Sequence, residues 1–232
     1  MLTAVSATFG YGRKAVVSEI DFTIARGQVT AVLGTNGAGK STLVKTVLGL
    51  QRLLGGQLTW TEPRPKPIAY LAQLTEFDRT FPMSAQDLVA SGNPAASRAD
   101  VQAALARVHL TDCGSMPVHE LSGGQLQRAR FARTILQDAA LIILDEPFAA
   151  VDQRREADLL ELIAAWADED RAVVLVLHSL SAALKYCANA LLLGQGGGDF
   201  GPTREILKSP NLVARGYMSQ AQIDVMHEAA HA

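Results

Sequence analysis

The stretch that decides the fold reads Gly34-Thr35-Asn36-Gly37-Ala38-Gly39-Lys40-Ser41. It matches the pattern Gly-x4-Gly-Lys-[Ser/Thr] at every position, between a predicted strand, Gln28–Leu33, and a predicted helix that ends at Gly49. Its glycines let backbone N–H groups face a polyphosphate, and the start of the helix adds partial positive charge. Lys40 can reach the β- and γ-phosphates, Ser41 can coordinate Mg²⁺, and Thr42 offers a further hydroxyl. This loop therefore predicts a site for nucleotide phosphates.

Strands alternate with helices along the rest of the chain, which is typical of an α/β fold with a mainly parallel sheet. We predict further strands over Ile20–Ile24, Gln57–Trp60, Ile68–Leu71, Leu141–Leu144, Val173–Leu177 and Ala190–Leu193. Between 81 and 136 the β-branched runs disappear, and alanine-rich pieces predict a helical insertion that includes Arg98–Leu110 and Leu126–Leu136. A helix is also predicted over Arg154–Ala167, whereas the glycine-rich segment Gly194–Gly201 is expected to be a turn.

Length and composition set the class of protein. The 232 residues suggest one or two domains at about 150 residues each. The net charge of −2 argues against nucleic-acid binding by bulk charge, and two distant cysteines argue against a disulfide framework. The start of the chain lacks the pattern of a signal peptide, and no apolar run approaches the ~18 residues of a membrane span. We therefore expect a cytoplasmic enzyme or binding domain.

Two carboxylates directly follow a predicted buried strand, in the run Leu141-Ile142-Ile143-Leu144-Asp145-Glu146. The carboxyl ends of parallel strands line the ligand crevice in α/β sheets. Asp145 is suited to hold Mg²⁺, and Glu146 is suited to polarise an attacking water. The alternative is a solvated strand end, which the phosphate loop makes the weaker account.

The segment Leu121-Ser122-Gly123-Gly124-Gln125 predicts a second helix start. Ser122 fits a helix N-cap, and Ser-x-x-Gln fits a capping box with Gln125 at the third helical position. Because the two glycines leave the backbone bare, this helix start can also bind an anion. A capped helix with no further role is the alternative.

With these motifs in this order, the chain resembles the ATP-binding-cassette (ABC) ATPases over almost its whole length. The resemblance implies a nucleotide-binding α/β core of the P-loop type with N-terminal antiparallel strands and a small helical subdomain. It also implies ATP and Mg²⁺ as cofactors and a head-to-tail dimer of two copies around two ATP molecules. In such a dimer the signature residues of one copy, Ser122, Gly123, Gly124 and Gln125, face the ATP held by the phosphate loop of the other. The implied division is a core over 1–80 and 137–215, a helical signature subdomain over 81–136 and a tail over 216–232.

Further family positions match this sequence one at a time. Tyr11 resembles the aromatic that stacks on adenine, and Gln73 resembles the glutamine that meets Mg²⁺ and water and senses the membrane partner. Asp152 resembles the aspartate of the subunit-contact loop, and His178 resembles the switch histidine at the γ-phosphate. The chain departs from the family at Ser179, where an acidic residue is frequent, and in the contact loop Phe148-Ala149-Ala150-Val151-Asp152.

The resemblance also suggests a role in transport. With no membrane span of its own, the chain needs a separate transmembrane permease, and indirectly an extracytoplasmic solute-binding protein. The resemblance therefore implies a peripheral position on the inner face of the cell membrane. The stretches 81–92 and 146–152 are similar to those of zinc and manganese importers. Import of iron chelates or another small solute is the alternative, and a soluble ABC ATPase acting on nucleic acid is a second one.

One further motif lies at the end of the chain. His227-Glu228-Ala229-Ala230-His231 matches the zinc-protease pattern His-Glu-x-x-His. A catalytic zinc needs a third protein ligand and a dry cleft, neither of which the last residues offer. A frayed terminal helix is the expected state, with a weak regulatory metal site as the alternative.

Overall fold

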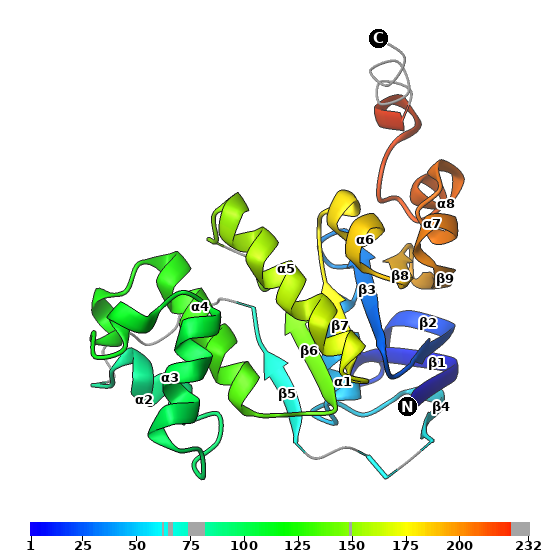
Figure 1. The fold of residues 1–232 in the computed structure, drawn as a ribbon. Helices are drawn as coiled ribbons and strands as arrows, with labels where there is room; N and C mark the ends of the chain where they lie inside the picture. Colours follow the sequence, from blue (N-terminus) through cyan, green and yellow to red (C-terminus); the bar gives the residue numbers. More distant parts are fainter. Residues whose placement is uncertain (62, 65–66, 74–81, 149, 224–232) are drawn as a thin grey trace. The chain divides into compact units, whose positions relative to one another are not determined.

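The computed structural model of the chain describes residues 1–61, 63–64, 67–73, 82–148 and 150–223 (Figure 1). Its elements follow in the order β1 (Leu2–Tyr11), β2 (Lys14–Ile24), β3 (Gln28–Gly34), α1 (Lys40–Val47), β4 (Gly55–Trp60), β5 (Ile68–Leu71), α2 (Ala85–Ala90), α3 (Arg98–Arg107), η1 (Thr111–Cys113), η2 (Val118–Glu120), α4 (Gly123–Leu136), β6 (Leu141–Asp145), α5 (Gln153–Asp168), β7 (Ala172–Val176), α6 (Leu180–Tyr186), β8 (Asn189–Gly194), β9 (Gly197–Pro202), α7 (Thr203–Ile206) and α8 (Ser209–Ala214). The described residues form two compact units, which are taken in turn: Met1–Arg64 with Val174–Ala232, and Pro65–Val173.

The first unit carries two groups of strands. In one, β1 pairs antiparallel with both β2 and β4. In the other, β3 pairs parallel with β8, and β8 pairs antiparallel with β9. Every residue of β3 from Val29 to Gly34 is buried, as expected for an interior strand of an α/β sheet. This buried strand leads through the phosphate loop into α1 (Figure 1).

The second unit joins parallel strands to a group of helices. Strands β5 and β6 pair in parallel, from Ile68 with Leu141 to Leu71 with Leu144. Helices α2, α3 and α4 pack against one another (Figure 1, green). The ring of Phe131 on α4 stacks on Trp166 of α5, with centroids 5.3 Å apart. The second unit thus contains both the predicted helical insertion and the strand that ends in the acidic pair.

Two local predictions were wrong. The segment Gly194–Gly201 is not a turn, because Gly197–Pro202 forms β9 and pairs along β8, which leaves only residues 195 and 196 between the strands. The helix predicted over Arg98–Leu110 ends at Arg107. His109 takes a left-handed conformation with φ 54°, and the N–H of Leu110 turns back to the carbonyl of Leu105, which closes the helix.

None of the helices within the described ranges combines the length and the apolar character that a bilayer span requires.

Candidate active site

The phosphate loop takes the conformation that its glycines permit. Gly37 and Gly39 have φ values of 82° and 100°, which lie in the region that residues with a Cβ avoid. At Gly39 a Cβ would also lie only 2.5 Å from Cγ2 of Val17. Gly39 is the N-cap residue of α1 and has no side chain with which to cap it. The N–H groups of the first turn therefore point into a loop that suits an anion.

Lys40 lies across this loop. Its side chain is buried, with 8% of the residue exposed, and its Nζ donates to the carbonyls of Gly34 at 2.8 Å and Thr35 at 3.1 Å. The neighbouring residues Thr35, Asn36 and Ser41 are exposed, whereas Thr42 is buried. The ammonium group is thus held among the carbonyls of the loop whose N–H groups can take phosphate.

Two other predicted residues, Tyr11 and His178, belong to the same unit. Tyr11 is the last residue of β1 and is 51% exposed. His178 follows β7 and is exposed, and its carbonyl accepts a hydrogen bond from the hydroxyl of Tyr217 at 2.6 Å. Ser179, which departs from the family pattern, caps α6 by accepting from the N–H of Ala182 at 3.2 Å.

The acidic pair lies at the end of β6 in the second unit. Asp145 is only 4% exposed and shares a hydrogen bond with the hydroxyl of Tyr70 on β5. Burial, the charge of Asp145 and this hydrogen bond raise the pKa of Tyr70 to about 12, so the phenol stays protonated and donates to the carboxylate. The sequence analysis did not identify Tyr70. The feature that could have indicated it is a hydroxyl on β5, the strand that pairs with β6 and its acidic end.

Glu146 is placed by a strained backbone. Its φ of 49° is left-handed, which is costly for a residue with a Cβ and is seen mainly where the surroundings enforce it. The Nε2 of Gln73 donates to the Oε2 of Glu146 at 2.9 Å. The structure therefore brings together the two residues that the sequence predicts to act on water, Gln73 and Glu146, across 73 positions of sequence.

The signature segment forms the predicted capping box. The N–H of Gln125 donates to Ser122 Oγ at 3.2 Å, and the N–H of Ser122 donates to Gln125 Oε1 at 2.8 Å. A Cβ on Gly124 would lie 2.8 Å from the carbonyl oxygen of Ala150, so the contact loop approaches too closely for a side chain there. Ser122 itself is exposed at the start of α4. This helix start can still receive an anion from outside the chain.

Asp152 has a structural role of its own. It is exposed and caps α5, where it accepts from the N–H of Arg155 at 3.1 Å. Its proposed contact with a second subunit is compatible with this position, because the capping bond uses one carboxylate oxygen only.

The donor chemistry of the predicted metal ligands fits Mg²⁺. Ser41, Gln73 and Asp145 offer a hydroxyl, an amide oxygen and a carboxylate, which are the hard oxygen ligands that Mg²⁺ prefers. Ser41 belongs to the first unit and the other two belong to the second. Three predictions fall outside the described residues: the start of the stretch from Phe81, Ala149 of the contact loop, and the His227–His231 motif.

Comparisons with known proteins agree with these observations. The family model described as ABC transporter matches residues 17–149. The manganese transport system ATP-binding protein MntB of Bacillus subtilis is 34% identical, over 89% of this chain and 88% of its own length. The zinc import ATP-binding protein ZnuC of Marinobacter nauticus is 33% identical, over 89% of this chain and 79% of its own.

A solved structure extends the match to three dimensions. A chain described as an ABC transporter of the metal-chelate type, in an inward-facing conformation, superposes with a TM-score of 0.81. It is 30% identical, and the alignment covers 94% of this chain and 89% of that one.

Proposed function

Because this chain belongs to the ABC transporter family, we propose that it is the subunit that hydrolyses ATP to drive import of a divalent metal ion, manganese or zinc. The chain is an ATPase with the α/β fold of that family, which confirms the predictions made from its motifs. The observation that supports metal import is that the similar proteins MntB and ZnuC are ATP-binding proteins of a manganese transport system and of zinc import.

Binding of ATP falls to the first unit. The N–H groups of residues 35–42 and the ammonium of Lys40 hold the phosphates, and Tyr11 stacks on the adenine. His178 contacts the γ-phosphate. Lys40 exchanges its carbonyl partners in the loop for phosphate oxygens, which are better partners for a cation because they are charged.

Hydrolysis uses the carboxylate at the end of β6. Glu146 orients the attacking water and takes its proton, while Gln73 fixes the carboxylate through their hydrogen bond. Asp145, Ser41 and Gln73 would hold Mg²⁺, and the bound ion would supply positive charge beside the phosphates. The Tyr70 hydroxyl orients Asp145 for this role.

The site is completed by a second copy of the chain. Ser122 and the bare backbone of Gly123 and Gly124 contact the γ-phosphate held by the other copy, and Gln125 supports them through the capping box. ATP thereby closes a head-to-tail dimer, Asp152 contributes to the contact between subunits, and hydrolysis reopens it. The proposed division assigns ATP binding and hydrolysis to a core over 1–80 and 137–215. It assigns the signature to a helical subdomain over 81–136, and it leaves a tail over 216–232.

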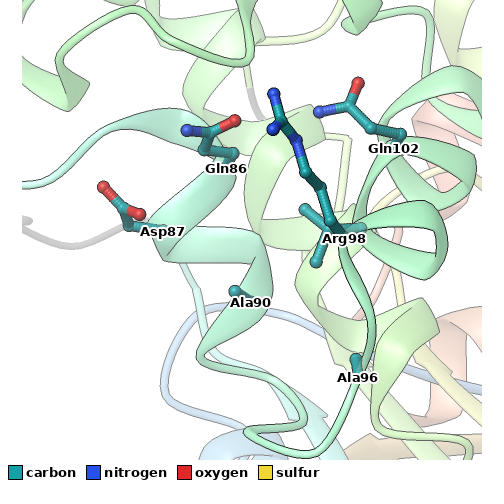
Figure 2. Close-up of a pocket in the computed structure, with 7 residues that line it drawn as sticks. Gln86, Asp87, Ala90, Ala96, Arg98 and Gln102 are labelled. Carbon is teal, nitrogen blue, oxygen red and sulfur yellow. The ribbon is translucent and has the colours of Figure 1, made fainter.

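The permease docks on the helical subdomain. A hollow of about 390 Å³ lies between α2 and α3, with Ala90 and Ala96 leaving it open. Gln86, Arg98 and Gln102 carry their polar ends to the same side of the hollow (Figure 2). The polar ends of these side chains can form hydrogen bonds with a cytoplasmic segment of the membrane partner. The ATPase is then a peripheral protein on the inner face of the membrane.

Reconstitution tests the proposed cargo. The full chain is combined with a candidate permease in vesicles, and ATP hydrolysis is measured with solute-binding proteins loaded with manganese, zinc or an iron chelate. We expect stimulation by the manganese- or zinc-loaded protein, and none when the chain carries Glu146→Gln. Stimulation by the iron chelate alone, or by nucleic acid without a permease, would contradict the proposed cargo.

A further inference from the structure

We propose that Gln127 and Arg130, on the helix that follows the signature, are positioning residues for ATP hydrolysis. Nη2 of Arg130 donates to the carbonyl of Ala72 at 2.7 Å, and its Nη1 donates to Gln127 Oε1 at 3.0 Å. Nε2 of Gln127 in turn donates to the carbonyl of Pro147 at 2.8 Å. The pair therefore joins α4 to the residues that follow β5 and β6.

These bonds form a closed ring with the hydrolytic pair. Ala72 directly precedes Gln73, and Pro147 directly follows Glu146. Gln73 donates to Glu146 at 2.9 Å, which closes the ring on its far side. Each of the two residues that act on water is thus held through its own hydrogen bond and through the backbone next to it.

The burial of Gln127 makes its hydrogen bonds specific. Gln127 is 0% exposed, and its amide uses both its oxygen and its nitrogen inside the ring. An amide that lost one of these partners would be left buried and unsatisfied, which costs about 1–3 kcal/mol. The fork of the Arg130 guanidinium reaches two acceptors at once, which a lysine ammonium cannot do with the same geometry.

The ring also supports a strained residue. Glu146 keeps its φ of 49° only while neighbouring groups hold the backbone there. The bond from Gln127 to the carbonyl of Pro147 fixes the peptide group between Pro147 and Phe148, one residue beyond Glu146. When that anchor is lost, the backbone can relax to an ordinary conformation and the carboxylate moves away from the water that it orients.

A loss of this kind acts on turnover rather than on ATP binding. The inference rests on the proposed roles of Gln73 and Glu146, whereas the phosphate loop belongs to the other unit and shares none of these contacts. We therefore expect Arg130→Met in the full-length chain to lower kcat for ATP hydrolysis about tenfold or more, with little change in KM. Arg130→Lys restores only part of the rate, because it restores one contact at most.

Arg133 provides the matched control. It lies three residues further along α4, and its Nε donates to Ser91 Oγ at 2.9 Å, outside the ring. Arg133→Met removes the same type of side chain from the same helix and is expected to leave kcat within about twofold of the wild type. Thermal unfolding of each variant separates a loss of fold from a loss of positioning.

A double-mutant cycle with Gln73→Ala tests whether Arg130 acts through the hydrolytic pair. If it does, Arg130→Met has almost no further effect on kcat once Gln73 has been truncated. Additive losses, equal losses in Arg133→Met, or a rise in KM that accounts for the whole effect would each overturn the inference. Glu146→Gln is measured beside them: if it retains turnover, the proposed role of Glu146 fails, whereas if it abolishes turnover and Arg130→Met has no effect, only the positioning role fails.

Discussion

Replacing Ser122 by alanine and by aspartate separates the helix cap from the proposed contact with ATP. Its Oγ accepts the N–H of Gln125 at 3.2 Å, and its own N–H is bound by Gln125 Oε1 at 2.8 Å. Alanine removes the acceptor, whereas aspartate keeps a capping oxygen and adds a negative charge at a helix start.

The two changes should affect stability differently. Loss of an N-cap acceptor costs about 1 kcal/mol, so Ser122→Ala lowers the melting temperature by about 2–4 °C for a chain of this length. Ser122→Asp leaves the melting temperature close to that of the wild type, because aspartate is as good an N-cap as serine.

ATP hydrolysis should follow the opposite order. Alanine removes one hydrogen bond to a charged phosphate, worth about 1.5–3 kcal/mol, which lowers the rate roughly 10- to 100-fold. Aspartate places a carboxylate against the γ-phosphate, and two like charges about 4 Å apart near a surface repel by about 4 kcal/mol, or roughly a thousandfold in rate.

Ser97 supplies the control for the cap alone. It forms the same box on α3, accepting the N–H of Asp100 at 3.2 Å. Ser97→Ala should lower the melting temperature as Ser122→Ala does, with the ATPase rate unchanged. Steady-state ATP hydrolysis and thermal unfolding of the three variants show whether Ser122 acts as a cap only or also contacts ATP. Near-normal hydrolysis by Ser122→Asp would show that Ser122 is only a cap, and the proposed contact with ATP would be refuted.

Two other predictions concern the docking hollow and the acid stability of the first unit. Ala90→Trp fills the hollow, so we expect basal ATP hydrolysis to persist while stimulation by the permease and a loaded binding protein is lost. Full stimulation of this variant would show that the permease docks at another surface. The hydrogen bonds from Arg215 hold the pKa of Asp199 below its ordinary value of 3.8, so this pair stabilises the fold above that pH and the gain disappears as pH falls through the lower folded value. In urea unfolding, Asp199→Asn should therefore be less stable than the wild type at neutral pH and indistinguishable from it in strong acid, and a gap that persists in acid would contradict this assignment.

The sequence predicted the parts of the fold that local patterns specify. The strand before the phosphate loop begins at Gln28 in both prediction and structure, and the capping box at Ser122 forms as its spacing indicates. The N-terminal strand β1 had no clear pattern, because it carries register shifts between Ala4 and Ala7 and a left-handed residue at Ser6. A strand with such bulges loses the regular alternation that reveals strands in sequence.

The glycine-rich strand β9 shows a second limit of sequence patterns. Its residues carry few apolar side chains, so the segment is typical of a turn. It becomes a strand because the buried strand β8 supplies both hydrogen-bond partners and apolar cover, and Gly198 lies where a Cβ would meet Leu193 at 2.8 Å. Tertiary pairing, rather than local preference, determines the conformation here.

For the site, the sequence indicated the functional residues but not the hydrogen bonds and backbone conformation that hold them in place. The acidic pair and Gln73 follow from motifs. The left-handed backbone of Glu146 could not be predicted, because a left-handed conformation is expected from sequence only at glycine. The bonds from Tyr70 to Asp145 and from Arg130 to Ala72 join positions 58 or more residues apart, which no local spacing can indicate. The roles proposed for Tyr11, Asp152 and His178 stay predictions.

In the proposed dimer, each ATP is served by the phosphate loop of one copy and the signature of another. This sharing of the site is tested by mixing two inactive variants, Lys40→Ala and Ser122→Asp. A mixed dimer has one site in which both Lys40 and Ser122 are intact, so at equal amounts the mixture should recover up to roughly a quarter of the wild-type ATPase rate. A mixture no more active than its two components would contradict the claim.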